Sequence, residues 1–148
     1  MTDQFFFDTD CLAAFLWVRE ESILEKLYPG KIILPAQVYE EIKKVPHLQA
    51  RADKMISNGV VQVESMMVDS DEYSDYVQMT SSENSLRIIG NGEAAGIAMV
   101  KHRGGTLASN SIISYRLLYF RVCYFECDRV LYWLLGKRNR VCSSYTLG

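Results

Sequence analysis

The chain has 148 residues, of which 49% are hydrophobic and 23% charged, and its formal net charge is −2. These values are typical of a globular domain and exclude a disordered, fibrous or membrane-embedded protein. No apolar stretch reaches the ~20 residues of a membrane-spanning helix, and the first residues show no secretory signal, so we expect no membrane association. The four scattered cysteines do not suit a disulfide framework, which favours reduced thiols and a cytoplasmic location.

The first 30 residues predict a buried strand followed by two helices. Three consecutive aromatic residues, Phe5–Phe7, indicate a strand that is buried on both faces. Asp8 closes this strand, and a helix is expected over residues 10–19. A second helix is expected over residues 21–28, where Pro29 and Gly30 end it.

The next part of the chain repeats this alternation of strands and helices. Residues 31–34 predict the second short strand, and Pro35 suits the first turn of a helix that continues to about Lys44. A further helix is expected over residues 48–57. The pair Asn58-Gly59 then favours a turn into an alternating strand at residues 60–63.

The pattern continues to about residue 109. Residues 69–79 predict a solvated helix, and residues 80–86 a polar loop. Apolar or small residues all round the segment 93–101 indicate a buried helix, and residues 106–109 predict the next strand. Such alternation is typical of a parallel sheet flanked by helices. Since no internal repeat or linker divides the chain, we expect a single domain over residues 1–148.

Three carboxylates occupy positions where an acidic group is unfavourable without a partner. Asp8 ends a buried strand, where open α/β sheets place their ligand crevice, so it requires a metal, a basic partner or a proton. Glu41 lies on the edge of an apolar helix face and either points inward or extends into solvent. Glu93 opens the buried helix after Gly92, which suits either the helix dipole or a ligand that approaches closely at the glycine.

Convergence of these three acids on one crevice would imply a divalent cation, because several carboxylates in one place repel each other. Hard oxygen ligands select Mg²⁺ or Mn²⁺. Such an ion can bind a phosphate oxygen and activate water for attack on a phosphodiester. The three acids together therefore point to phosphodiester hydrolysis.

Four segments resemble the PIN domain family, the nuclease fold of many VapC-like toxin ribonucleases of prokaryotic toxin–antitoxin pairs. They are residues 7–10, 34–42, 90–98 and 105–110. None is specific alone, but they follow the family's order and cover about residues 4–115. The resemblance implies an α/β fold, a PIN-like α/β/α sandwich with a central parallel sheet, and a metal-dependent endoribonuclease.

The resemblance also implies the roles of particular residues. The family's three first acids fall on Asp8, Glu41 and Glu93, which would be catalytic and hold Mg²⁺ or Mn²⁺. The family's fourth acid falls where this chain has Asn110 followed by Ser111, so Asn110 would be a weak, uncharged metal contact. Thr9 and Asp10 are expected to orient Asp8 or a metal-bound water, and Ser109 and Ser111 are expected to be further supporting groups of the site.

Partners follow from the same resemblance: RNA as substrate, a small antitoxin protein, and a homodimer by family analogy. An RNA substrate needs cationic side chains for its phosphates. The candidates are Lys43 and Lys44 after the second strand, and Lys101 and Arg103 at the end of the buried helix, although each also fits an ordinary solvated surface. Two histidines, His47 and His102, have no partner at a ligand spacing and are interpreted as surface residues.

The segment 113–148 departs from the family pattern. Residues 111–148 hold 2 acidic and 6 basic side chains, against 16 acidic and 10 basic before them, and contain three of the four cysteines. Cys123 and Cys127 could form half of a metal site, but core packing is the simpler interpretation. One hypothesis is a tail shifted out of its ancestral reading frame, which the alternate frames of the gene would test.

Two other functions remain open. The missing fourth acid and the atypical tail favour a degenerate, non-catalytic PIN domain that binds RNA or protein. A small α/β nucleotide-binding or regulatory protein would need a phosphate-binding loop, for which Gly90-Asn91-Gly92 is too short.

Overall fold

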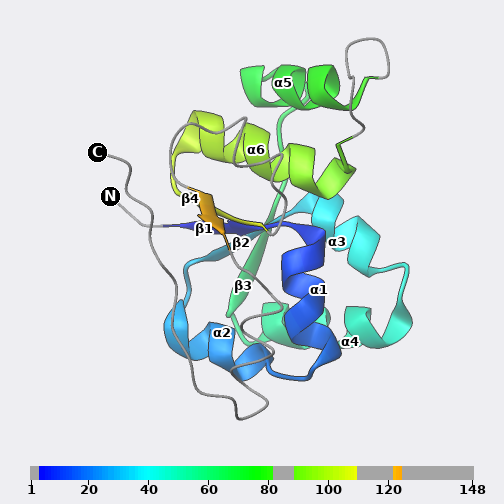
Figure 1. Cartoon of the computed structure of the whole chain (residues 1–148), viewed down its shortest axis with the longest axis vertical. Helices are drawn as coiled ribbons and strands as arrows, with labels where there is room; N and C mark the ends of the chain where they lie inside the picture. Colours follow the sequence, from blue (N-terminus) through cyan, green and yellow to red (C-terminus); the bar gives the residue numbers. More distant parts are fainter. Residues whose placement is uncertain (1–3, 82–88, 110–121, 125–148) are drawn as a thin grey trace.

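A parallel sheet of five strands forms the centre of the fold (Figure 1). The computed structural model describes residues 4–81, 89–109 and 122–124, the last three by their backbone alone. The sheet order is β3-β2-β1-β4-β5, and every neighbouring pair is parallel. The strands are β1 (Phe5–Phe7), β2 (Ile32–Pro35), β3 (Val61–Glu64), β4 (Thr106–Ser109) and β5 (Val122–Tyr124).

Helices cover both faces of this sheet, as parallel strands require, because each crossover carries the chain back over a face. They are α1 (Thr9–Trp17), α2 (Glu21–Leu27), α3 (Ala36–Ile42), α4 (Pro46–Ser57), α5 (Asp71–Thr80) and α6 (Asn91–Arg103). Phe7 and Leu34 pack with α1 to α4 on one face, and Phe6 and Ile33 pack with α6 on the other. This alternation along the strands produces an α/β/α sandwich, with α5 lying outside α6 (Figure 1).

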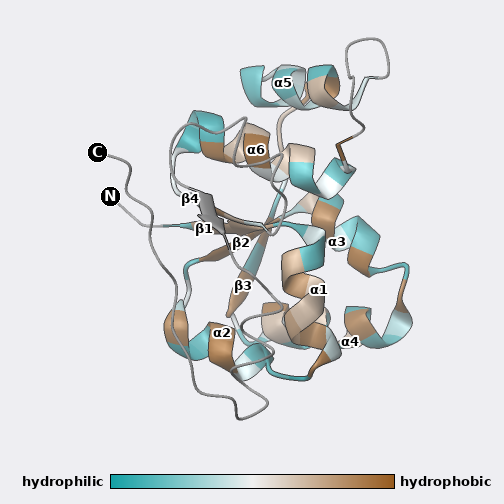
Figure 2. Ribbon diagram, viewed as in Figure 1, coloured by the Kyte–Doolittle hydropathy of each residue, from teal (hydrophilic) through white to brown (hydrophobic). Residues whose placement is uncertain are grey.

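The distribution of apolar residues explains why these elements pack as they do, because the apolar faces of the helices cover the sheet. Hydrophilic residues are prominent on α5, the helix that lies outside α6 (Figure 2). The predicted strands and helices of the described residues are confirmed, with ends shifted by at most two residues. The predicted loop 80–86 lies largely outside the described residues, and β5 lies in the part of the chain for which no element was predicted. Among the described helices, none combines the length and apolar character needed to cross a bilayer.

The chain order creates a switch point between β1 and β4. The chain first builds outward from β1 through β2 to β3, and then returns to the opposite side of β1 to add β4. The helix that follows β1, α1, packs on one face of the sheet, and the helix that precedes β4, α6, packs on the opposite face. In open α/β sheets a ligand crevice forms at such a point, outside the carboxyl ends of the strands. Asp8 and Ser109 stand at those two ends.

Candidate functional site

Asp8 is a buried carboxylate at the switch point, only 4% exposed. Its Oδ1 accepts a hydrogen bond of 2.8 Å from the backbone N–H of Cys11, so the side chain caps α1. Burial raises the pKa of Asp8 to about 6. The Asp10 and Glu93 charges add to this rise, while hydrogen bonds from Ser109 and Cys11 oppose it. None of these groups is a cation, so no described basic side chain compensates the Asp8 charge.

The raised pKa of Asp8 predicts a pH-dependent stability. The folded value of about 6 lies above the ordinary 3.8, so the folded protein holds this proton more tightly. This contribution to the free energy of unfolding is complete below pH 3.8 and is lost as the pH rises through about 6. The whole difference is about 3 kcal/mol.

Urea unfolding of wild type and Asp8→Asn, in chelator, measures this effect. Because asparagine does not ionise, the variant should gain roughly 1.5 kcal/mol relative to wild type between pH 5 and pH 8. Asp69→Asn, at an exposed position, is the control and should show no such gain. A difference between Asp8→Asn and wild type that is constant over this range would contradict the prediction.

Glu41 points inward from α3 and reaches both α1 and α6. The Thr9 hydroxyl donates a hydrogen bond to Glu41 Oε2, and the Gly92 backbone N–H donates to Oε1 at 3.3 Å. Gly92 lies in the first turn of α6, where backbone N–H groups have no partner within the helix and the dipole favours an anion. The inward alternative for Glu41 is therefore confirmed.

Gly92 allows this contact because it has no side chain. A Cβ at this buried position would overlap Thr9 Oγ1 and lie 3.0 Å from both Glu41 Oε2 and Val38 Cγ2. The space beside Gly92 is thus filled by protein. The interpretation of this glycine as a point of close ligand approach is wrong for this space, since the glycine serves the packing of α6 against α1 and α3.

Glu93 follows in the same first turn of α6, where a carboxylate is favoured by the dipole. Its side chain lies near enough to Asp8 for its charge to raise the Asp8 pKa. The start of α1, the last turn of α3 and the start of α6 therefore each bring one acid to the same region. Among the described residues, however, no three Asp, Glu, His or Cys side chains are grouped closely enough to hold one ion.

The donor chemistry nevertheless fits a hard divalent cation. The three acids offer only carboxylate oxygens, the ligands that Mg²⁺ and Mn²⁺ prefer. Asp8 adds a buried negative charge that a cation would compensate. The other expected contacts, Asn110 and Ser111, lie outside the described residues, as do the side chains of Cys123 and Cys127.

The groups expected to orient the acids have different partners. Ser109 is fully buried and hydrogen-bonds to the Asp8 side chain, as a supporting role requires. Thr9 contacts Glu41, whereas the sequence pointed to Asp8 or water as its partner. Asp10 is exposed in the first turn of α1 and affects Asp8 only through its charge.

Tyr76 is a neighbour that sequence reasoning missed. Burial raises its pKa, and the charges of Tyr73 and Glu41 add to the rise. Tyr76 lies on α5, which packs on α6. This packing brings the Tyr76 hydroxyl close enough to Glu41 for the carboxylate charge to raise the Tyr76 pKa. No local pattern in the sequence signals it.

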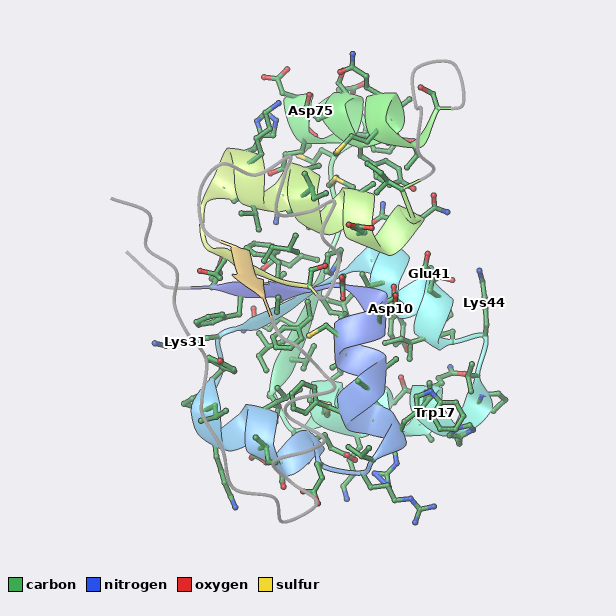
Figure 3. The ribbon with its side chains drawn as sticks, viewed as in Figure 1. Asp10, Trp17, Lys31, Glu41, Lys44 and Asp75 are labelled. Atoms are coloured by element: carbon green, nitrogen blue, oxygen red, sulfur yellow. The ribbon has the colours of Figure 1, made fainter. Side chains whose placement is uncertain are left out.

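Two of the four predicted RNA-binding cations lie close to Glu41 in the chain. Lys43 pairs with Glu40 at 2.7 Å, and its Nζ lies 5.4 Å from the centre of the Tyr39 ring. Lys44 is exposed, and its side chain makes no ion pair or hydrogen bond with the residues that the structure describes. Figure 3 shows Lys44 on the same side of the molecule as Glu41.

The other two cations lie at the opposite end of α6. Glu93 and Arg103 are ten residues apart, which is about 15 Å along a helix. Lys101 Nζ lies 2.6 Å from Asp75 Oδ2, a carboxylate that also contacts His102. Arg103 Nε lies 2.6 Å from Glu72 Oε1 and its guanidinium also pairs with Glu64, which ties α6 to α5 and β3. The structure therefore does not bring these cations to the site.

We expect Arg103→Met to lower the free energy of unfolding by about 1 kcal/mol, since partly exposed ion pairs contribute little each. Any RNA cleavage, measured per folded molecule, should not change, because Arg103 lies at the opposite end of α6 from Glu93. Urea unfolding and a cleavage assay on the same preparation test this, with Lys31→Met as a control at an exposed lysine. A loss of cleavage at unchanged stability would mean that Arg103 contacts RNA after all.

Comparisons with known proteins identify the fold. No family model and no curated protein matches the chain. The structure is similar to that of VapBC2 from Rickettsia felis bound to a DNA fragment from its promoter, with a TM-score of 0.54 and 17% identity over 80% of this chain and 96% of that chain. At this identity the likeness shows the fold. The predicted fold class is thereby confirmed: the chain is an α/β protein with a PIN-like α/β/α sandwich around a parallel sheet.

Proposed function

We propose that the chain is a cytoplasmic endoribonuclease that hydrolyses RNA phosphodiester bonds with Mg²⁺ or Mn²⁺. The observation that carries the proposal is the buried Asp8 carboxylate at the switch point, with Glu93 acting on it. An acid with a strongly raised pKa in such a crevice is typical of a functional site. The PIN-like fold supports the choice of a nuclease among the functions such a site can serve, by analogy of fold.

In this proposal Asp8, Glu41 and Glu93 hold the cation, and Asn110 is a weaker contact. A bound divalent cation supplies charge stabilisation at the phosphate and lowers the pKa of water. Hydrogen bonds from Thr9 and Gly92 hold Glu41.

Protonation of Asp8 competes with the cation for the same carboxylate. With its pKa at about 6, Asp8 is largely ionised at pH 7 and largely protonated at pH 5. Metal ligands must be deprotonated, so affinity for the ion should fall as the pH decreases through about 6. The hydrogen bonds from Ser109 and Cys11 limit the rise of the Asp8 pKa, so that the carboxylate is still mostly ionised near pH 7.

RNA would reach this site along the side of the molecule that carries Lys44, with Lys43 beside it. The neighbouring structure is a VapBC2 complex bound to DNA. By that likeness we propose that the chain is the toxin of a toxin–antitoxin pair, with a small antitoxin protein as its partner. A homodimer is proposed by analogy with the PIN domain family alone.

A second candidate function is a non-catalytic PIN domain that binds RNA or protein. Two observations favour it: no three ligands are grouped within the described residues, and the family's fourth acidic position holds Asn110 followed by Ser111. Both functions share the fold, so they differ in metal binding and in cleavage.

Calorimetric titration with Mn²⁺, together with incubation of a mixed single-stranded RNA with Mn²⁺ or chelator, separates the two functions. The nuclease should bind Mn²⁺ and produce fragments only with the metal. Glu25→Gln, at an exposed position on α2, is a control that should bind and cut normally. A folded protein that neither binds Mn²⁺ nor cuts RNA would overturn the proposal and leave the binding module.

A further inference from the structure

An exposed aromatic pair lies outside the candidate site, between α1 and α4. Trp17, the last residue of α1, is 59% exposed. Its ring centroid lies 4.5 Å from that of His47, with an interplanar angle of 69°. His47 is exposed in the first turn of α4. An indole left open to solvent in this way offers a large flat surface to a ligand.

The pair is connected to the candidate site by one face of α1. Asp10 and Trp17 are seven residues apart, a rotation of about 700°, so both side chains leave the helix within about 20° of each other. Between them this face carries Ala13 and Ala14, whose side chains are small and half-buried and therefore do not protrude from the helix surface. The separation along the axis is about 10 Å. Figure 3 shows Asp10, Glu41, Lys44 and Trp17 on the same side of the molecule.

The side chains beside this face of α1 suit a single-stranded nucleic acid. Aromatic rings stack with bases, and cations beside them contact the phosphates. Lys44 is exposed with no described side-chain partner, and it lies between Glu41 and His47 in the chain. An exposed tryptophan with Val18 beside it, 37% exposed, also suits a contact between protein chains, and the measurement of mass below tests that alternative.

We propose that Trp17 and His47 form a base-stacking subsite for single-stranded RNA, with Lys44 on the backbone between this subsite and the acids. The inference rests on the proposed function for RNA as the ligand. About 10 Å along α1 separates Trp17 from Asp10, so the base that stacks on Trp17 would belong to another nucleotide than the one whose phosphate reacts. The subsite binds a base by its face and therefore tolerates different sequences.

Tryptophan fluorescence tests stacking directly. The chain has two tryptophans, so Trp133→Phe leaves Trp17 as the single reporter. In chelator, which prevents metal-dependent cutting, a 12-nucleotide single-stranded RNA should quench this fluorescence. An abasic strand of the same length should not. Equal responses to the two strands, or no response to either, would overturn the proposal.

Anisotropy of the same labelled RNA on the otherwise unaltered chain provides a second measurement. We expect Trp17→Ala to weaken binding on the order of tenfold and Trp17→Phe to retain most of it, because stacking needs only an aromatic face. Leu27→Ala is the matched control, since Leu27 is 58% exposed on α2. In Lys44→Met the slope of log affinity against log salt concentration should decrease by about 1, which corresponds to the loss of one phosphate contact.

The outcomes separate this inference from the nuclease itself. Cleavage by wild type with the same RNA affinity in Trp17→Ala would overturn the subsite and keep the nuclease. Quenching and a tenfold loss of affinity without any cleavage would support the subsite and overturn the nuclease. If Trp17→Ala changes the sedimenting mass while RNA affinity stays the same, the pair is a contact between protein copies and the inference is wrong.

Discussion

Replacing Asp8 by asparagine should reduce RNA cleavage at least a hundredfold while the protein stays folded. Asparagine has nearly the same shape and keeps an oxygen that can accept the hydrogen bond from Cys11, so the cap of α1 is retained. It removes the negative charge that a cation requires. Because burial disfavours the ionised carboxylate, the variant should be at least as stable as wild type at pH 8.

The measurement is the initial rate of RNA cleavage in Mn²⁺, with circular dichroism and urea unfolding of the same samples. Asp69→Asn, which changes an exposed acid before α5, should cut at the wild-type rate. Mn²⁺ binding should be lost together with cleavage in Asp8→Asn. A variant that still cuts at the wild-type rate would show that Asp8 is not part of the catalytic site.

The second large effect concerns a residue without any functional group. Gly92→Ala should lower cleavage by one to two orders of magnitude, because the added methyl displaces Thr9 and Glu41, the partners in the hydrogen bond that holds the carboxylate. Either α6 moves away from α1 and α3, or Glu41 leaves its position. The overpacking should also lower the free energy of unfolding by about 1–3 kcal/mol.

A second glycine on the same helix provides the control. In Gly96→Ala the new Cβ would lie 2.7 Å from Leu107 Cδ1, the far end of a side chain in the core. This change should alter stability without altering cleavage per folded molecule, since no acid lies beside it. Thermal unfolding and cleavage rates of both variants separate the two effects. Equal activity of Gly92→Ala and wild type would mean that Glu41 does not depend on this packing.

Local patterns were sufficient for the predicted elements and for the first acid. The helices and the alternating strand at residues 60–63 have hydrophobic periods that can be counted along the chain, whereas β1 and β2 were recognisable as short apolar runs and β5 was not predicted. Asp8 was recognisable because it follows three aromatic residues directly, so its burial was implied by its neighbours. Glu93 was recognisable by its place at the start of an all-round apolar helix.

The direction of Glu41 could not be decided in this way. Its position on the edge of the apolar face of α3 allows either an inward or an outward side chain, and the choice depends on Thr9 and Gly92, which are distant in the sequence. The same holds for the cations: Lys101 and Arg103 resemble an RNA-binding cluster until α5 packs on α6 and supplies Asp75 and Glu72. Ion pairs between helices follow from packing, which no local period encodes.

The sequence by itself therefore determined the alternation of strands and helices, the parallel sheet and the burial of Asp8, because these depend on side-chain chemistry within a few consecutive residues. Only the tertiary structure decided the strand order, the partners of Glu41, the filling of the space beside Gly92 and the contact of Trp17 with His47. These features depend on contacts between segments that the chain brings together only when the sheet and its two helix layers pack.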